Sequence, residues 1–343
     1  MNVLITGGAG YIGSHAAQRL LRDGHTVAVV DNLSRGHRAA VAALQDGANG
    51  GRLAYAEADI ADRAAVEGLI TAHGITVVMH FAAFASVGES AQDPLLYYRN
   101  NVSGMIALLE ACAATGIERF VFSSSCSTYG QPPEHLIPTP EDCPQAPISP
   151  YGMTKLHGEH LLGHYAERCR AAGRPFAFAA LRYFNVAGAD RGGRLGEDHD
   201  PETHLIPVVL QAALGRRERV AILGTDYPTP DGTCVRDYIH VEDLVDAHVA
   251  VMQALRPSDA RAYNLGIGKG YSVREIIDAA RAVTARPFEV VEAARRPGDP
   301  PRLYADPARI EREIGWRASV TDLHTIIASA YAWFRDHPTG YGA

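Results

Sequence analysis

Short apolar runs alternate with helix-like segments over the first half of the chain. The runs are rich in Val, Ile, Leu and Phe, which is typical of strands buried on both faces of a sheet. They span residues 2–6, 26–31, 53–56, 76–82, 118–123 and 176–183. Between them, apolar residues recur at helical spacing, as in Ile12, Ala16 and Leu20. Helical crossovers between strands make a sheet parallel, so the pattern predicts a doubly wound α/β fold.

The pattern changes after about residue 185, where Gly, Pro and Asp become frequent. Loops rich in these residues alternate with helical patterns near 203–214, 241–255 and 271–283. We therefore predict two domains, residues 1–185 and residues 186–343, of which the second is a smaller α/β substrate-binding lobe. Residues 230–255 can return to the first domain. Long loops in a compact protein usually carry function, so we expect part of the site in the second lobe.

Composition and charge argue against several classes of function. The chain has 343 residues and a net charge of -7, and its 32 basic residues are scattered, so we expect a small-molecule substrate and no nucleic-acid partner. Its five cysteines are odd in number and include no CxxC, which argues against a disulfide framework and a zinc ribbon. We find no basic leader and no apolar stretch near the roughly 20 residues of a membrane span, so we expect a cytoplasmic location without membrane binding.

A glycine-rich turn follows the first predicted strand directly. Gly7, Gly10 and Gly13 stand between that strand and the first helical pattern. Glycine permits a tight turn, close approach of the backbone to a pyrophosphate, and close packing of helix on strand. This context, rather than the glycine spacing alone, predicts a dinucleotide site on a Rossmann sheet.

Asp31 ends the second predicted strand, 18 residues after Gly13. This distance is close to the roughly 20 residues expected for the carboxylate that hydrogen-bonds the adenosine ribose. A carboxylate there repels a 2′-phosphate, so the sequence predicts NAD as the cofactor. Arg35 and His37 lie nearby and leave NADP as an alternative.

Two further strand ends are placed to contact the dinucleotide. Asp59 and Ile60 follow the third strand and can reach the adenine, and Phe81, Ala82 and Ala83 follow the fourth and can line the cofactor. Asp59 has an alternative interpretation as the cap of a helix over residues 61–72.

Candidate catalytic residues follow the fifth strand. Ser123, Ser124 and Ser125 come at its carboxyl end, where open sheets bind ligands. Tyr151 and Lys155 then stand four residues apart at the start of a helix. Residues at this spacing share one helical face, so the ammonium can stabilise the phenolate and lower the pKa of the phenol from about 10. Together with bound NAD⁺, this predicts a tyrosine that acts as a base near neutral pH.

At this point the sequence resembles the extended short-chain dehydrogenase/reductase family, also called the NAD-dependent epimerase/dehydratase family, and within it the UDP-glucose 4-epimerases. The resemblance covers nearly the whole chain. Its motifs are GGAGYIGSH at 7–15, DNLSRG at 31–36, HFAA at 80–83, VGES with DPLLYYRNNVSG at 87–104, SSSCSTYG at 123–130, SPYGMTK at 149–155, LRYFNVAGA at 181–189, GTDYPTPDGTCVRDYIHVEDL at 224–244 and RRPGDPPRLYAD at 295–306.

The resemblance implies interconversion of UDP-galactose and UDP-glucose by hydride transfer to and from NAD through a 4-keto intermediate. It implies that Ser125 hydrogen-bonds the sugar 4-hydroxyl, that Tyr151 removes its proton, and that Lys155 holds the nicotinamide ribose. It adds to the cofactor site Tyr11, Ile12, Asn32, Ser34, Asn100 and Tyr183. It assigns to the UDP-sugar Asn185, His204, Leu205, Ala221, Leu223, Arg236, Tyr238, Arg296, Asp299 and Leu303.

Several positions depart from the family pattern. Cys126 stands where many members have Ala, and Cys there also occurs in relatives that act on UDP-pentoses, so UDP-xylose/UDP-arabinose interconversion stays open. Ala85 replaces a lysine that some members use near the cofactor phosphates. His204 replaces a common asparagine. Leu303 matches a gate for the hexose 2-substituent and is intermediate in size, which leaves UDP-N-acetylhexosamines open.

The same residues also bear on three other functions. A sugar-nucleotide 4,6-dehydratase needs an acid and a base after Ser125, where this chain has Cys126 and Ser127. A net NAD-dependent sugar-nucleotide oxidoreductase shares the catalytic residues and stays open. A non-catalytic dinucleotide-sensing regulator commonly loses the pair that Tyr151 and Lys155 supply here.

We expect no metal ligands. His157, His160 and His164 form a stripe on the helix that carries Tyr151, but they point away from it, and we predict a solvated or subunit-facing surface. The acidic cluster at 197–200 predicts a solvated loop. The resemblance implies a homodimer formed by the Tyr151 helix and the helical segment at 93–115.

Overall fold

The computed structural model describes residues 1–46, 50–296 and 298–342. Pro297, within the motif at 295–306, therefore lies outside the described residues. The chain forms two compact units. Unit 1 comprises Met1–Thr128, Pro147–Arg182 and Val245–Tyr263, and unit 2 comprises Tyr129–Ala146, Tyr183–Leu244 and Asn264–Ala343. The domain boundary expected at 185/186 stays a prediction, because a compact unit is not in itself a functional domain.

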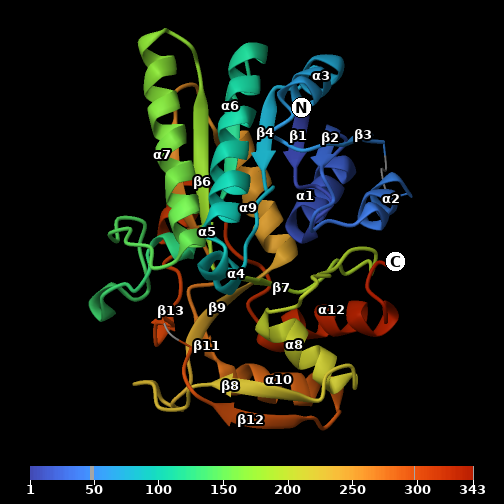
Figure 1. The fold of residues 1–343 in the computed structure, drawn as a ribbon, viewed down its shortest axis with the longest axis vertical. Coiled ribbons are helices and arrows are strands. Elements are labelled where there is room, and N and C mark those ends of the chain that lie inside the picture. The colour runs from blue at the N-terminus through green and yellow to red at the C-terminus, as the bar shows by residue number, and fades with distance from the viewer. Residues whose placement is uncertain (47–49, 297, 343) are drawn as a thin grey trace. The chain divides into compact units, whose positions relative to one another are not determined.

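Unit 1 is built on a seven-stranded sheet with the order β10-β6-β5-β4-β1-β2-β3 (Figure 1). Its strands are β1 (Asn2–Thr6), β2 (Thr26–Asp31), β3 (Arg52–Glu57), β4 (Val77–His80), β5 (Arg119–Ser125), β6 (Ala177–Tyr183) and β10 (Ala260–Leu265). Its helices are α1 (Tyr11–Arg22), α2 (Arg38–Asp46), α3 (Arg63–His73), α4 (Val87–Gln92), α5 (Pro94–Tyr97), the π-helical turn η1 (Tyr98–Ser103), α6 (Gly104–Thr115), the 3₁₀ turn η2 (Cys126–Thr128), α7 (Pro150–Ala171) and α9 (Val241–Ala254).

Helices cover both faces of this sheet. Side chains of α3, α6 and α7 pack on one face with strand residues such as Leu4, Val78 and Phe120, all of them fully buried. Because side chains alternate along a strand, the neighbours of these strand residues point to the other face, where α1 packs on β1 and β2. The ion pair between Arg19 and Asp246 joins α1 to α9. The sheet is therefore doubly wound.

The sequence predicted this fold class correctly. All six predicted strands are present, with bounds that match or are shifted by at most two residues, and the pairs β1–β2, β1–β4, β2–β3 and β4–β5 are parallel. The seventh strand, β10, was missed. Its first half is exposed or half-buried, so its sequence ARAYNL lacks the continuous apolar character of the others.

Unit 2 contains two smaller sheets. In one, β9 pairs with β11, β13 and β7, and in the other β8 pairs with β12. Its strands are β7 (Asn185–Ala187), β8 (Arg219–Leu223), β9 (Val235–His240), β11 (Gly270–Ser272), β12 (Glu289–Ala293) and β13 (Arg302–Leu303). Its helices are the 3₁₀ turn η3 (Glu134–Leu136), α8 (Leu205–Ala213), α10 (Val273–Thr284), α11 (Ala308–Ile314) and α12 (Leu323–Asp336).

The core of unit 2 lies between its sheets and helices α8, α10 and α12. Leu210, Ile276, Ile326 and Trp333 are buried together there. The helices predicted near 203–214, 241–255 and 271–283 correspond to α8, α9 and α10. Over the described parts of the chain, we find no helix whose length and apolar character would let it cross a bilayer.

Candidate functional site

Two of the three glycines predicted for the dinucleotide site, Gly7 in the turn after β1 and Gly13 in α1, have no room for a side chain. Gly7 has a φ of +72°, and a Cβ there would lie 2.6 Å from the backbone nitrogen of Ala82. A Cβ on Gly13 would lie 2.1 Å from the carbonyl oxygen of Gly7. A Cβ on Gly10 would meet only that same oxygen, at 3.4 Å. Gly10 is the N-cap of α1, and no side chain hydrogen-bonds the first N–H groups of this helix, which begins at Tyr11. The N–H groups of Tyr11 and Ile12 can therefore bind an anion.

Asp31 is fixed beside this turn. Its Oδ2 accepts a hydrogen bond from the backbone N–H of Ala9 at 2.9 Å, and its Oδ1 accepts one from Leu33 at 2.8 Å. Burial raises the pKa of Asp31, and the two backbone N–H groups oppose this shift. The carboxylate is thus held at the carboxyl end of β2, and its role as a ribose ligand stays a prediction. Arg35 forms an ion pair with Glu89.

Asn32 connects the end of β2 to the end of β3. Its Nδ2 donates to Asp59 Oδ2 at 2.8 Å, and its Oδ1 accepts from the backbone N–H of Ser34 at 3.0 Å. Asp59 also accepts from the N–H of Ala61, whereas the cap of α3 is Asp62. The alternative interpretation of Asp59 as a helix cap is therefore wrong. Ile60 is buried.

The loop after β4 adjoins the glycine turn. The backbone N–H of Phe81 donates to Thr6 O at 3.0 Å, and Ala82 lies against Gly7. Ala83, next along the chain, is half-buried, which leaves it accessible to a ligand. The small residues at 82 and 83 thus stand at the edge where the cofactor was predicted.

Asn101 is a buried residue that sequence analysis missed, next to the predicted Asn100. Its side chain accepts from the N–H of Phe84 at 2.9 Å and donates to Phe84 O and to Thr154 Oγ1. Asn100 donates to Asn101 Oδ1 at 2.9 Å. This network fixes the loop after β4, the turn η1 and helix α7 relative to one another within unit 1. π-Helical turns such as η1 often mark functional sites, and NN at 100–101 was the available signal.

Tyr151 and Lys155 lie together on the first turns of α7. The helix begins at Pro150, and the Ser149 side chain caps it by accepting from the N–H of Gly152 at 3.1 Å. Both predicted residues are buried, at 8% and 4% exposure. Lys155 Nζ lies 5.9 Å from the centre of the Tyr151 ring and donates to Ser123 O at 2.7 Å. Burial lowers the pKa of Lys155 to about 7.

The end of β5 supplies the serines next to this pair. Ser125 is buried, and its Oγ accepts from the N–H of Ser127 at 3.1 Å. Ser124 Oγ donates to Glu159, which also binds Arg182 through two of the arginine's nitrogens. This buried ion pair, which sequence analysis missed, ties the middle of α7 to β5 and β6.

His80, a buried histidine, adds no positive charge to the region around Lys155. His80, at the end of β4, stacks on the Phe122 ring and hydrogen-bonds Thr6 Oγ1 at 2.7 Å. Burial, and then the charge of Lys155, lower the pKa of His80 to about 3. His80 is therefore neutral near pH 7, and the positive charge of this region comes from Lys155.

Unit 2 brings several of the predicted UDP-sugar residues onto neighbouring strands. Tyr238 on β9 pairs with Asn185 on β7, and Arg236 on β9 pairs with Leu303 on β13. Tyr238 and Leu303 are buried. Tyr183, assigned to the cofactor, ends β6 just before this group.

Asp299 stands between the two predicted arginines. Arg296 makes two hydrogen bonds to its carboxylate, at 3.1 and 2.9 Å, and Arg236 lies 3.7 Å from it. Arg236 also donates to the carbonyl oxygens of Val235 and Pro300. Two guanidinium groups are thus held around one carboxylate, an arrangement with a net positive charge that suits a diphosphate.

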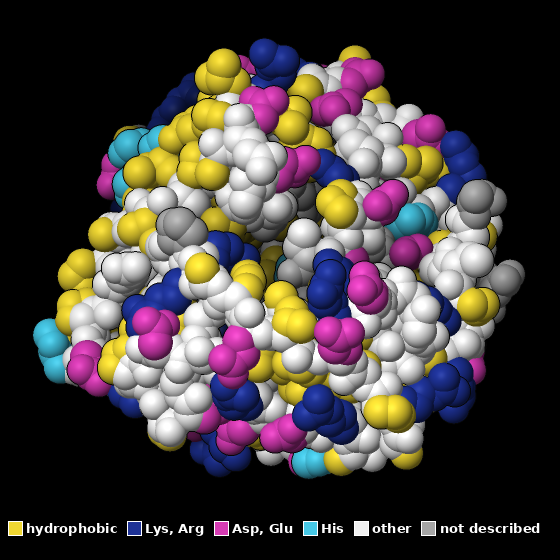
Figure 2. Space-filling model, turned by 60° about the horizontal axis from the view of Figure 1, so that its bottom comes forward, with side chains coloured by type: hydrophobic (Ala, Val, Ile, Leu, Met, Phe, Trp, Pro, Cys, Tyr) yellow, Lys and Arg dark blue, Asp and Glu magenta, His cyan; other side chains and the backbone are white. Residues whose placement is uncertain are grey.

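The remaining predicted residues lie on other elements of unit 2. Ala221 and Leu223 occupy the exposed side of β8, in a different sheet from Arg236. His204 and Leu205 form the start of α8. On the face shown in Figure 2, Lys and Arg side chains are interspersed with Asp and Glu. Opposite charges also pair within unit 2, as Arg274 and Glu292 do.

Two surface predictions have different outcomes. On α7, His160 and His164 are exposed and His157 contacts the Tyr98 ring, in agreement with a largely solvated stripe. The acidic cluster at 197–200 is not wholly a solvated loop, because Glu197 is buried. Glu197 and Glu202 instead meet His199 and His204, and sequence analysis missed this grouping.

Comparisons with known proteins agree with this geometry. The model of the NAD dependent epimerase/dehydratase family matches residues 3–266. The UDP-glucose 4-epimerase of Halalkalibacterium halodurans is 45% identical over 342 residues, which cover 99% of this chain and 98% of that protein. UDP-arabinose 4-epimerase 1 of Arabidopsis thaliana is 44% identical over 346 residues, covering 99% of this chain and 81% of that protein.

A solved structure is similar over the same length. It is the UDP-glucose-4-epimerase from Stenotrophomonas maltophila with bound NAD and formylated UDP-arabinopyranose, with a TM-score of 0.92 and 40% sequence identity. The similarity covers 98% of this chain and 99% of that one. The resemblance found in the motifs is thereby confirmed, and the chain belongs to the NAD-dependent epimerase/dehydratase family.

Proposed function

We propose that this protein is a UDP-glucose 4-epimerase, an NAD-dependent isomerase that interconverts UDP-galactose and UDP-glucose through a 4-keto sugar. The observation that carries the proposal is the buried pair of Tyr151 and Lys155, whose amine donates to Ser123 O on β5, the strand that ends at Ser125. Full-length similarity to UDP-glucose 4-epimerases supports the same activity.

The residues of unit 1 fit NAD. Added Cβ atoms would fill the cradle at Gly7 and Gly13, the first N–H groups of α1 have no side-chain cap, and Asp31 suits the two hydroxyls of an adenosine ribose. We assign the adenine side to Asn32, Asp59 and Ile60. When bound, NAD supplies an acceptor that takes a hydride from C4 of the sugar and gives it back.

The chain's own residues manage the proton at O4. Tyr151, as phenolate, takes this proton while C4 is oxidised and returns it when the ketone is reduced. Lys155 keeps a positive charge near the phenolate and so stabilises it. Ser125 donates a hydrogen bond to the 4-oxygen and holds it beside the tyrosine. A ketone presented with its other face inverts the configuration at C4.

The residues of unit 2 anchor the nucleotide. Arg236 and Arg296 offer forked donors to the diphosphate oxygens, and Asp299 orients both guanidinium groups. Strong contacts to UDP together with few contacts to the hexose leave the sugar free to rotate, which an epimerase needs. A 4,6-dehydratase also needs an acid and a base near C5 and C6, and the turn η2 after Ser125 offers Cys126 and Ser127 instead.

UDP-pentoses are the second candidate substrate class. UDP-arabinose 4-epimerase 1 of Arabidopsis thaliana is 44% identical to this chain, nearly the same identity as the bacterial UDP-glucose 4-epimerases have. Cys126 and the intermediate size of Leu303 also leave room for a different sugar. The chemistry at C4 is the same for hexoses and pentoses, so only the sugar pocket separates the two functions.

Product formation from three substrates tests both candidates. The purified protein, without added cofactor, is incubated separately with UDP-galactose, UDP-N-acetylgalactosamine and UDP-xylose, and epimers are followed by NMR. We expect the highest kcat/KM with UDP-galactose. A higher kcat/KM with UDP-xylose would transfer the assignment to UDP-pentoses. A stoichiometric rise in reduced cofactor without epimer would overturn the proposal in favour of a net oxidoreductase.

We also propose that the protein is a cytoplasmic homodimer that serves galactose metabolism. No disulfide joins its five cysteines in the described structure, which supports a reducing compartment. Leu95 on α5 and Ile106 on α6 are 72% and 42% exposed, and they lie in the segment at 93–115 that the family resemblance assigns to the dimer. Light scattering coupled to size-exclusion chromatography tests this: a mass of one chain would refute the dimer.

A further inference from the structure

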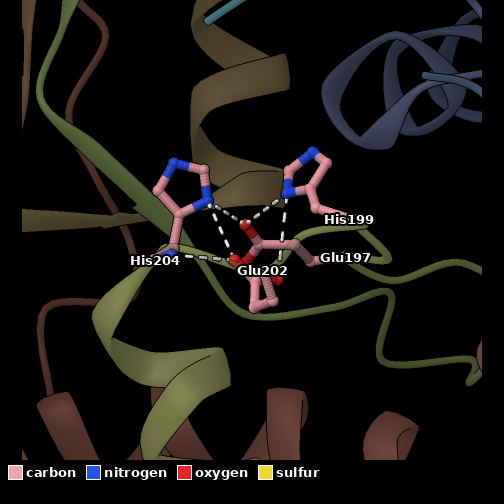
Figure 3. A group of neighbouring side chains, drawn as sticks. All are labelled: Glu197, His199, Glu202 and His204. Carbon is pink, nitrogen blue, oxygen red and sulfur yellow. Dashed lines mark hydrogen bonds and ion pairs between the residues drawn. The ribbon is translucent and has the colours of Figure 1, made fainter. Parts of the chain in front are cut away.

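Four metal-ligating side chains converge in unit 2, and one of them, His204, is also assigned to the UDP-sugar by the family resemblance. Glu197, His199, Glu202 and His204 each place a donor atom within 4.8 Å of the others. Figure 3 shows the Glu197 carboxylate between the two imidazole rings. It is the only such group among the residues that the structure describes.

The donor atoms lie close enough together to share one metal ion. Glu197 Oε1 lies 2.6 Å from His204 Nδ1 and 3.2 Å from His199 Nδ1. The Glu202 oxygens lie 3.9 Å from His199 Nδ1 and 3.6 Å from His204 Nδ1. Zinc bonds of about 2.0–2.1 Å in a tetrahedron separate the ligand atoms by about 3.4 Å. The four separations, which involve both Glu202 oxygens, lie on either side of that value, so the side chains would have to rotate to place one donor atom each around an ion.

The charges of the group also favour a divalent cation. The side chains of Glu197 and Glu202 are both only 4% exposed, so two carboxylates lie buried next to each other. Buried carboxylates need positive partners. One divalent ion supplies two positive charges, which match the charges of the two carboxylates. His199 and His204, at 32% and 50% exposure, line the way in from solvent.

The surrounding backbone holds the ligands in place. The N–H groups of Thr203 and His204 donate to Glu202 Oε1 at 2.7 and 2.8 Å, which leaves Oε2 to face His199. On either side of Glu197, Gly196 and Asp198 hydrogen-bond Tyr341. Partners of this kind orient metal ligands in known sites.

We propose that Glu197, His199, Glu202 and His204 bind one zinc-class divalent transition-metal ion that closes the loop 197–204 onto the start of α8. Two imidazole nitrogens and two carboxylate oxygens suit Zn²⁺, whereas Mg²⁺ and Ca²⁺ prefer oxygen ligands alone. The spacing of the two histidines also lies within the range common in zinc sites. The proposal departs from the expectation that the chain has no metal ligands, and it does not depend on the proposed function.

Calorimetric titration with ZnCl₂ tests the site. Full-length protein without an affinity tag, with its bound dinucleotide, is first freed of metal with a chelator. We expect one Zn²⁺ per chain with a Kd below about 1 μM. His199→Ala is expected to weaken binding at least about 100-fold, beyond the loss typical of an outer-shell partner. The matched control is His160→Ala, which removes an exposed histidine of α7 and is expected to leave the affinity unchanged.

Two further measurements keep the proposal falsifiable if His199→Ala alters the fold. In the presence of chelator, His199→Ala and Glu202→Gln should each have a Tm near that of the unsubstituted protein. Adding Zn²⁺ should raise the Tm of the unsubstituted protein but not that of either variant. X-ray absorption of the zinc-loaded protein should show two imidazole ligands and bonds of about 2.0–2.1 Å. A Kd above about 1 μM, equal binding by both variants and the unsubstituted chain, or fewer than two imidazoles would overturn the proposal in favour of an ion-pair cluster.

Discussion

Replacing Lys155 by methionine isolates the effect of burying its amine. Burial is the only cause of its shift, which takes its pKa from 10.5 to about 7. Between these values the unfolded chain binds one more proton than the folded chain. The free energy of unfolding therefore rises with pH in this window, by about 1.36 kcal/mol per pH unit for this group alone. Below pH 7 the charged amine destabilises the fold in full, and above pH 10.5 the penalty is gone.

Between pH 7 and pH 9 this amounts to about 2 kcal/mol, because the folded amine is half-protonated at the lower limit. The assay is urea unfolding of the cofactor-free protein followed by circular dichroism, at both pH values. Other groups titrate alike in both proteins, so the comparison with Lys155→Met removes them. We expect the stability of the unsubstituted protein, relative to Lys155→Met, to increase by about 2 kcal/mol from pH 7 to pH 9. Parallel pH dependences would refute the reasoning.

Three further substitutions test separate parts of the account. Tyr151→Phe removes the base, so kcat for UDP-galactose measured by NMR should fall about 10²–10⁴-fold with little change in KM; a loss below tenfold would contradict the role. Gly13→Ala places a Cβ 2.1 Å from Gly7 O, so we expect the purified variant to lack bound dinucleotide, as measured by absorbance. The control Gly163→Ala, whose Cβ would meet nothing within 4 Å, should retain the dinucleotide. Leu303→Gly should raise kcat/KM for UDP-N-acetylgalactosamine relative to UDP-galactose by about tenfold or more; an unchanged ratio would exclude Leu303 as the gate.

Continuous apolar strands made the parallel sheet of unit 1 predictable, because most of its strands, unlike the half-buried β3, are buried on both faces. The strands of unit 2 are short, and β8 alternates exposed with buried residues, so none of them produced a run that stands out. The order of the site residues along the chain was also predictable, because each of them follows a strand end or shares one helix face. These residues are the glycine turn, Asp31, the serines and the Tyr151–Lys155 pair.

Residues that act through distant partners could not be predicted. Asn101 has a role only because Phe84 and Thr154 come close to it in the fold. The sequence of segment 197–204 is typical of a polar loop. Its periodicity does not predict that the chain turns back so that Glu197 and His204 come into contact. Such contacts depend on tertiary packing, which hydrophobic spacing does not encode.

The central claim is that C4 of the sugar loses a hydride to the bound cofactor and receives the same hydride back. UDP-galactose carrying deuterium at C4 tests this most directly, with NMR of the UDP-glucose formed in ordinary water. The account predicts full retention of deuterium at C4, because the label never reaches solvent. Replacement of the label by solvent hydrogen would contradict it, since C4 would then have exchanged a proton rather than a hydride.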